Sequence, residues 1–131
     1  MSDQRLTRKR KTKAPCTGCY LHMSLCICDL IPRLDLATKV TLVVHAKEFK
    51  RTTNTGRLAT RSLVNSEVRV RGETPEGVDL SDLISMNYRT MLFYPSEGAI
   101  ELTPELVHQD SKQIQLIVPD GNWRQASKVN Y

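Results

Sequence analysis

Four cysteines, the only ones in the chain, lie within one short segment. They are Cys16, Cys19, Cys26 and Cys28. The Cys-x2-Cys pair lets two thiolates face one point across a tight turn, for which Gly18 supplies the backbone freedom. The Cys-x-Cys pair supplies two more thiolates, and four at this spacing are typical of structural zinc. We therefore predict a zinc knuckle near the N-terminus, with all four cysteines as tetrahedral ligands.

Other interpretations of the cluster remain open. A disulfide pair would need an oxidising compartment, and buried free cysteines seldom lie so close together in sequence. An iron–sulfur cluster uses the same four ligands, and His22 could replace one thiol. The net negative charge of a zinc tetrathiolate would be partly offset by nearby basic residues upstream, among them Lys9, Arg10, Lys11 and Lys13.

A second candidate for chemistry is the segment that begins with Asp120. Its carboxylate follows an apolar run, Gly121 permits close backbone approach, and Trp123 is the only tryptophan. These features make Asp120 a candidate site residue. As a plain structural residue it could cap the next helix, and Trp123 could belong to the core.

A third candidate is the start of a predicted helix, where Asn54, Thr55 and Gly56 precede Arg57. Backbone N–H groups at a helix N-terminus favour a phosphate or carboxylate. Further cations nearby are Lys50, Arg51 and Arg61. A glycine-assisted helix cap with solvated arginines is the alternative.

Polar loops follow three apolar runs that predict buried strands. The runs are residues 40–44, 90–94 and 114–118, and the loops are 45–48, 94–98 and 119–123. In a parallel sheet the carboxyl ends of the strands share one edge, where ligands of open α/β folds bind. We therefore expect these loops, including Tyr94, Pro95 and Ser96, to form a site, although loops are polar for other reasons too. In the first loop, His45 and Glu48 could pair.

The remaining pattern indicates an α/β domain with a mainly parallel sheet. A further short strand is expected at residues 67–71. Helices are expected at 57–65, 80–84, 103–108 and 123–130, and the loop from His45 extends to Thr53. Pro95 and Pro119 are expected to end the strands that precede them. We divide the chain into a flexible basic arm (1–14), the knuckle (15–32) and the α/β domain (33–131).

Charge is distributed unevenly along the 131 residues. Residues 33–71 hold nine basic and three acidic residues, whereas residues 72–110 hold one arginine and eight acids. With the basic arm, this polarity favours a polyanion partner such as nucleic acid. No apolar run is long enough to span a membrane, and the N-terminus lacks the apolar stretch of a secretory signal, so we expect a cytoplasmic protein.

Taken in order, these motifs resemble one known family. The cysteine cluster, His45-x2-Glu48, residues 54–58, residues 94–96 and Asp120-x2-Trp123-x-Gln125 occur in sequence over residues 16–129. Together they closely resemble the DTW-domain family of tRNA-uridine aminocarboxypropyltransferases, which belongs with the SPOUT-like proteins. Asn122 stands where the family's signature has threonine. The family's domain also continues past the signature helix, so we expect the domain to be incomplete at Tyr131.

The resemblance implies a reaction and its participants. It implies transfer of the 3-amino-3-carboxypropyl group of S-adenosylmethionine to N3 of a tRNA uridine, with structural Zn²⁺ in the knuckle. Asp120 would act on the uracil proton or hold the donor, and Trp123 would stack on a base or shape the pocket. Substrate-binding candidates are Asn54, Thr55, Gly56, Arg57, Tyr94, Pro95, Ser96, Asn122 and Gln125. Two other functions remain open: methyl transfer to RNA from the same donor, and a non-catalytic RNA-binding module.

Overall fold

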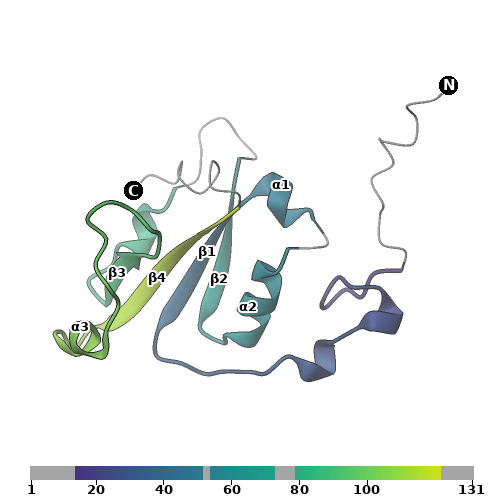
Figure 1. The fold of residues 1–131 in the computed structure, drawn as a ribbon, viewed down its shortest axis with the longest axis horizontal. Coiled ribbons are helices and arrows are strands. Elements are labelled where there is room, and N and C mark those ends of the chain that lie inside the picture. Colours follow the sequence, from purple (N-terminus) through teal and green to yellow (C-terminus); the bar gives the residue numbers. More distant parts are fainter. Residues whose placement is uncertain (1–13, 52–53, 73–78, 122–131) are drawn as a thin grey trace.

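The structure is a computed structural model that describes residues 14–51, 54–72 and 79–121 (Figure 1). The predicted basic arm, apart from Ala14, lies outside these residues. So does the predicted helix over 123–130, together with the candidate site residues Asn122, Trp123 and Gln125.

A four-stranded sheet forms the centre of the described fold. Its strands are β1 (Lys39–His45), β2 (Ser66–Arg71), β3 (Tyr88–Leu92) and β4 (Gln113–Asp120). Their order in the sheet is β2-β1-β4-β3, and every neighbouring pair is parallel. The predicted α/β fold with a mainly parallel sheet is therefore confirmed. Because all strands run the same way, their carboxyl ends lie along one edge.

Short helices connect and flank these strands. The α-helices are α1 (Ala46–Phe49), α2 (Gly56–Ser62) and α3 (Pro104–His108), and the 3-10 helices are η2 (Met23–Leu25), η3 (Cys28–Leu30) and η4 (Ser81–Leu83). The start of α3 follows from its sequence, since the Thr103 side chain accepts from Leu106 N–H and Pro104 occupies the first turn. The longest helix among the described residues has seven residues, too few to cross a bilayer.

The core lies where β1 and β4 pack beneath η4. Val43, Leu80, Leu83 and Ile117 form a buried apolar cluster. Gln115 is buried beside it, and its amide donates to the carbonyl of Leu83 at 2.6 Å. This bond satisfies the buried side chain. It also fixes η4 against the centre of the sheet.

Several element boundaries differ from the prediction. The helix expected at residues 57–65, for example, is α2 and ends at Ser62. The end of β4 has a clear physical cause. β4 continues through Pro119 to Asp120 instead of ending at the proline. The Phe93 N–H bonds to the Ile117 carbonyl, so alternate residues of β4 face β3. The nitrogen of Pro119 therefore faces the side where β3 has already ended, and its missing N–H costs no ladder bond.

Two further differences concern β3 and the loop after His45. β3 covers Tyr88–Leu92, so it begins and ends earlier than the expected run at 90–94. The expected polar loop after His45 contains α1, whose first turn is capped by the His45 ring accepting from Lys47 N–H at 3.1 Å. A histidine in this position can cap a helix as an aspartate does.

Candidate functional site

The four predicted metal ligands converge on one point. The sulfur atoms of Cys16, Cys19, Cys26 and Cys28 all lie within 4.8 Å of one another. Those of Cys16 and Cys28, and of Cys16 and Cys26, are 3.6 Å apart. This is the spacing of four sulfurs around one tetrahedral zinc at a Zn–S distance of about 2.3 Å, and it is well beyond a disulfide bond. The arrangement therefore fits Zn²⁺, and we call residues 16–28 the Cys knuckle.

Local backbone geometry brings the sulfurs together. Gly18 N–H donates to the Cys16 sulfur at 3.3 Å, and Tyr20 adopts a positive φ of 62° that closes the turn. A Cβ atom on Gly18 would lie 2.7 Å from the Cys28 sulfur, so only glycine fits there. The ring of His22 bonds to Ser24, and His22 is not among the converging ligands.

The thiols of the knuckle are electrostatically coupled. Backbone N–H groups of Cys19 and Gly18 lower the pKa of Cys16 to about 6. The neighbouring sulfurs of Cys26 and Cys16 raise the pKa of Cys28 to about 12. Without a cation, four thiolates so close together cannot all be ionised, because each ionised sulfur disfavours the next. A bound Zn²⁺ would supply the missing positive charge.

A second convergence occurs at the carboxyl edge of the sheet. Asp120, the last residue of β4, pairs with Val44 of β1. Its Oδ2 atom accepts from the Asn54 side-chain amide at 3.0 Å across 66 residues of sequence. A Cβ atom on Gly56 would lie only 2.6 Å from the same oxygen. We call Asn54, Gly56 and Asp120 the edge junction.

The edge junction lies where an external anion was predicted to bind. A negative charge does lie at the start of α2, but it belongs to the chain's own Asp120. Thr55 is exposed and makes no side-chain bond as the N-cap of α2. Gly121, directly after Asp120, adopts a φ of 149° that favours glycine.

The arginines near the start of α2 make different contacts within the chain. The Arg57 guanidinium lies over the Tyr20 ring at 3.9 Å and near the Phe49 ring at 4.8 Å. Arg51 pairs with Glu48 at 2.8 Å. The expected His45–Glu48 pair is not found among these contacts. Glu48 pairs with Arg51 instead, and the His45 ring caps α1. The stacking of Arg57 was not predicted, because no local pattern joins Tyr20 to residue 57.

The predicted loop at 94–96 lines a separate cavity of about 560 Å³. Its walls are mainly apolar and come from the end of β3 and the following loop, with Leu106 of α3 and Leu116 of β4. Tyr94, Pro95 and Ser96 all line it, whereas no residue of the edge junction does. The structure therefore brings Asn54, Gly56 and Asp120 together and assigns the 94–96 loop to a neighbouring cavity.

Comparison with protein families gives a match that covers nearly the whole chain. The pattern of the DTW domain matches residues 13–131, which include the Cys knuckle, the edge junction and the 94–96 loop. No solved structure matches, so the SPOUT-like relationship stays a prediction. The resemblance inferred from the ordered motifs is confirmed. The chain belongs to the DTW-domain family.

Proposed function

We propose that this protein modifies tRNA by transferring the 3-amino-3-carboxypropyl group of S-adenosylmethionine to N3 of a uridine. Membership of the DTW-domain family is consistent with a tRNA-modifying enzyme. The proposal goes further and names the reaction, its donor and a cytoplasmic location. Reduced thiols, which the Cys knuckle needs, are maintained in that compartment.

The proposed reaction moves one alkyl group and one proton. N3 of uracil loses its proton and forms a bond to the γ-carbon of the donor. The bond between that carbon and the sulfonium breaks, its electron pair returns to sulfur, and neutral methylthioadenosine leaves. Because the sulfonium is already a good leaving group, the protein must mainly align the two reactants and accept the proton.

The observation that carries the proposal is the position of Asp120. It ends the central strand β4 at the carboxyl edge, where open α/β sheets bind their ligands. The amide of Asn54 holds one carboxylate oxygen, Oδ2, which fixes the direction of the other. A carboxylate anchored in this way can accept the uracil proton through its second oxygen. In the proposal, Asn54 is a positioning residue and Asp120 is the base.

The cavity beside the 94–96 loop suits part of the donor. Its volume of about 560 Å³ is typical of a small-molecule site, and its mainly apolar walls suit a purine base. Phe93 lines the cavity, is 57% exposed and could stack on that base. Zn²⁺ in the Cys knuckle would be structural, since four sulfurs complete its coordination.

The test is incubation of the protein with tRNA and S-adenosylmethionine, followed by mass analysis of the nucleosides. We expect aminocarboxypropyl-uridine from the wild type and at least about 100-fold less from Asp120→Ala. Asp120→Asn, which keeps the shape but cannot accept a proton, should lose as much activity. Asp35→Ala removes an exposed carboxylate elsewhere and should retain it. Full activity in Asp120→Asn would contradict the role of Asp120 as base.

The same experiment separates the two other functions. A methylated nucleoside, which has a much smaller mass increase, would identify a methyltransferase. A protein that binds tRNA but neither binds S-adenosylmethionine nor changes any nucleoside would be an RNA-binding module.

A further inference from the structure

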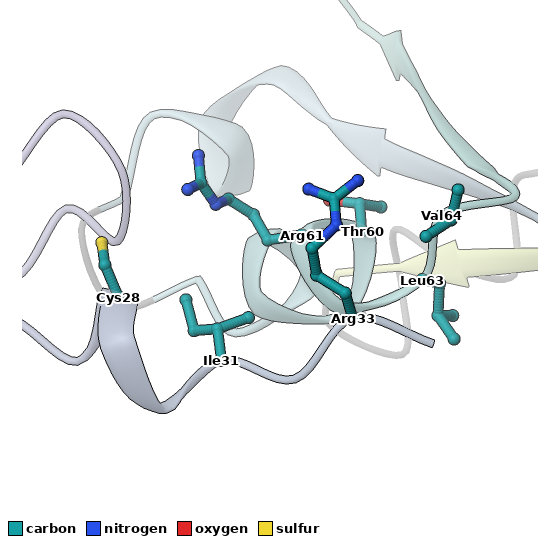
Figure 2. A pocket seen from close by; sticks show the side chains of 7 residues that line it. All are labelled: Cys28, Ile31, Arg33, Thr60, Arg61, Leu63 and Val64. Atoms are coloured by element: carbon teal, nitrogen blue, oxygen red, sulfur yellow. The ribbon is translucent and has the colours of Figure 1, made fainter. Parts of the chain in front are cut away.

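A pocket of about 400 Å³ lies between the Cys knuckle and α2 (Figure 2). It is distinct from both the edge junction and the cavity at the 94–96 loop. Its lining comes from the end of the knuckle, the linker that follows it, α2, and the residues just after α2. We call it the arginine pocket, and its lining residues are Cys28, Ile31, Arg33, Thr60, Arg61, Leu63 and Val64.

Among the residues that the structure describes, two guanidinium groups and no carboxylate line this pocket. Arg33 comes from the linker and Arg61 from α2, and Figure 2 shows both side chains extending on the same side of the pocket. Ile31, Leu63 and Val64 supply its apolar surface. Two cations beside apolar walls, without an acid to neutralise them, form an anion site of the kind that binds phosphate.

The other arginines with described contacts are committed to partners within the chain. Arg69 pairs with Glu67 and Asp82, Arg51 pairs with Glu48, and Arg89 donates to the Leu106 carbonyl. Among the described residues, by contrast, neither Arg33 nor Arg61 forms an ion pair or a side-chain hydrogen bond. Their charges are therefore available to a ligand.

We propose that the arginine pocket binds one backbone phosphate of the tRNA, which rests on the proposed tRNA substrate. A phosphodiester has two non-bridging oxygens that share one negative charge, and planar guanidinium groups bind such oxygens in pairs. Contacts of this kind position an RNA without reading its sequence. Because Cys28 lines the pocket and Ile31 and Arg33 follow it closely, metal binding in the knuckle also orders one wall of the phosphate site.

Arg61 has a second neighbour that the test must separate. A Cβ atom on Gly18 would lie 3.4 Å from Arg61 Nη2, so this guanidinium is also close to the Cys knuckle. The alternative role of Arg61 is to offset the negative charge of zinc-bound thiolates and not to bind phosphate. Zinc content, measured on each variant, distinguishes that role from phosphate binding.

The experiment measures the binding of fluorescently labelled tRNA to zinc-loaded protein over a range of salt concentrations. The variants are Arg33→Gln, Arg61→Gln and the double variant. The control is Lys112→Gln, which removes an exposed positive charge outside the pocket. We expect each single variant to bind about 5- to 20-fold more weakly near 0.1 M salt, and the control to change by less than about 2-fold. If both arginines hold one phosphate, the double variant should lose less than the product of the two single losses.

The salt dependence gives a second, independent reading. Loss of one phosphate contact should make the negative slope of log K against log salt less steep by about 0.7 to 0.9. The change should be the same in the double variant as in either single variant. Inorganic phosphate should compete with tRNA for the wild type more strongly than for the double variant. Competition by free phosphate without any loss of tRNA affinity in the variants would overturn the assignment to RNA.

Four further outcomes are decisive. Unchanged tRNA affinity in both single variants, or loss of zinc from Arg61→Gln at wild-type tRNA affinity, would overturn the phosphate site. Arginine-dependent tRNA binding without any nucleoside product would support the pocket and refute only the proposed reaction. Product formation with a wild-type KM for tRNA in the double variant would refute only the pocket.

Discussion

The Cys knuckle and the edge junction bring polar groups together by different means. Between residues 14 and 40 the only buried side chains are Cys16 and Cys19, and the helices η2 and η3 bury none. The edge junction, in contrast, lies at the end of β1 and β4, each of which has several buried residues. We therefore expect the knuckle to depend on a bound metal for order, whereas the edge junction depends on the packing of the sheet.

Helix α2 connects these two regions. Its first residue, Gly56, lies against Asp120, and its second, Arg57, lies over the Tyr20 ring of the knuckle. In Figure 1 the knuckle accordingly lies beside α2, away from β3. A change in one region can reach the other through this helix, and the following changes test how independent the two are.

Removal of one metal ligand should have the largest effect. Cys16→Ser should reduce zinc from one ion per chain to none, because structural zinc binding contributes about 10 kcal/mol or more to the fold of such a segment. The sheet should persist, since the core cluster of Val43, Leu80, Leu83 and Ile117 contains no knuckle residue. Metal analysis and far-ultraviolet circular dichroism measure the two effects. Thr17→Ala, at an exposed position in the same segment, is the control and should keep its zinc.

A methyl group on Gly56 should damage the edge junction and leave the knuckle intact. The added Cβ would lie 2.6 Å from both Asp120 Oδ2 and Leu42 Cδ2, so the carboxylate must move. We expect Gly56→Ala to lower transfer activity about 100-fold, the cost of displacing a reacting group by about 1 Å. Zinc content should not change. Kinetics with tRNA and metal analysis on the same sample measure both.

The matched change in the knuckle is Gly18→Ala. Its Cβ would lie 2.7 Å from the Cys28 sulfur, so this variant should bind zinc more weakly, as measured by competition with a chelator. Gly98→Ala is the control for replacing a glycine by alanine as such. Gly98 has a φ of 80°, and among the described residues no atom lies within 4 Å of the position that a Cβ would occupy. Equal zinc affinity in Gly18→Ala and the wild type would show that the knuckle tolerates a Cβ there.

The stacking of Arg57 on Tyr20 measures the coupling between the two regions directly. We expect Arg57→Gln to lower the free energy of unfolding of the zinc-loaded protein by about 1–2 kcal/mol, the range of a partly desolvated cation–π contact. Denaturant unfolding of Arg57→Gln, Tyr20→Leu and the double variant gives the interaction energy. Strictly additive losses would show that the ring and the guanidinium do not stabilise each other.

The smallest effect is expected at an ion pair remote from both regions. Arg69 donates to both carboxylate oxygens of Asp82, at 3.0 and 2.7 Å, and this lowers the pKa of Asp82. The pair therefore stabilises the fold above the unfolded-state pKa of about 4, and the contribution is lost as the pH falls through the lower folded value. Asp82→Asn should lower the melting temperature slightly at pH 7 and not at about pH 2. In an Arg69→Gln background, the substitution should have no pH-dependent effect.

Much of the fold could be predicted from local patterns, and the errors have specific causes. The β-branched run at 40–44 indicated β1, and Pro104 indicated the start of α3, because both signals act within a few residues. The extension of β4 through Pro119 could not be predicted, since it depends on where the neighbouring strand ends. The capping of α1 by His45 was missed because a histidine cap has only a weak sequence signal.

The sequence by itself determined the Cys knuckle, because its four ligands lie within thirteen residues and one tight turn can bring them to a common point. Only the tertiary structure decided that Asn54 and Gly56 meet Asp120, and that Arg33 and Arg61 line one pocket. Side chains so far apart in sequence become neighbours only when strand order and register are set. That order follows from how apolar faces pack across the whole sheet, which no short segment encodes.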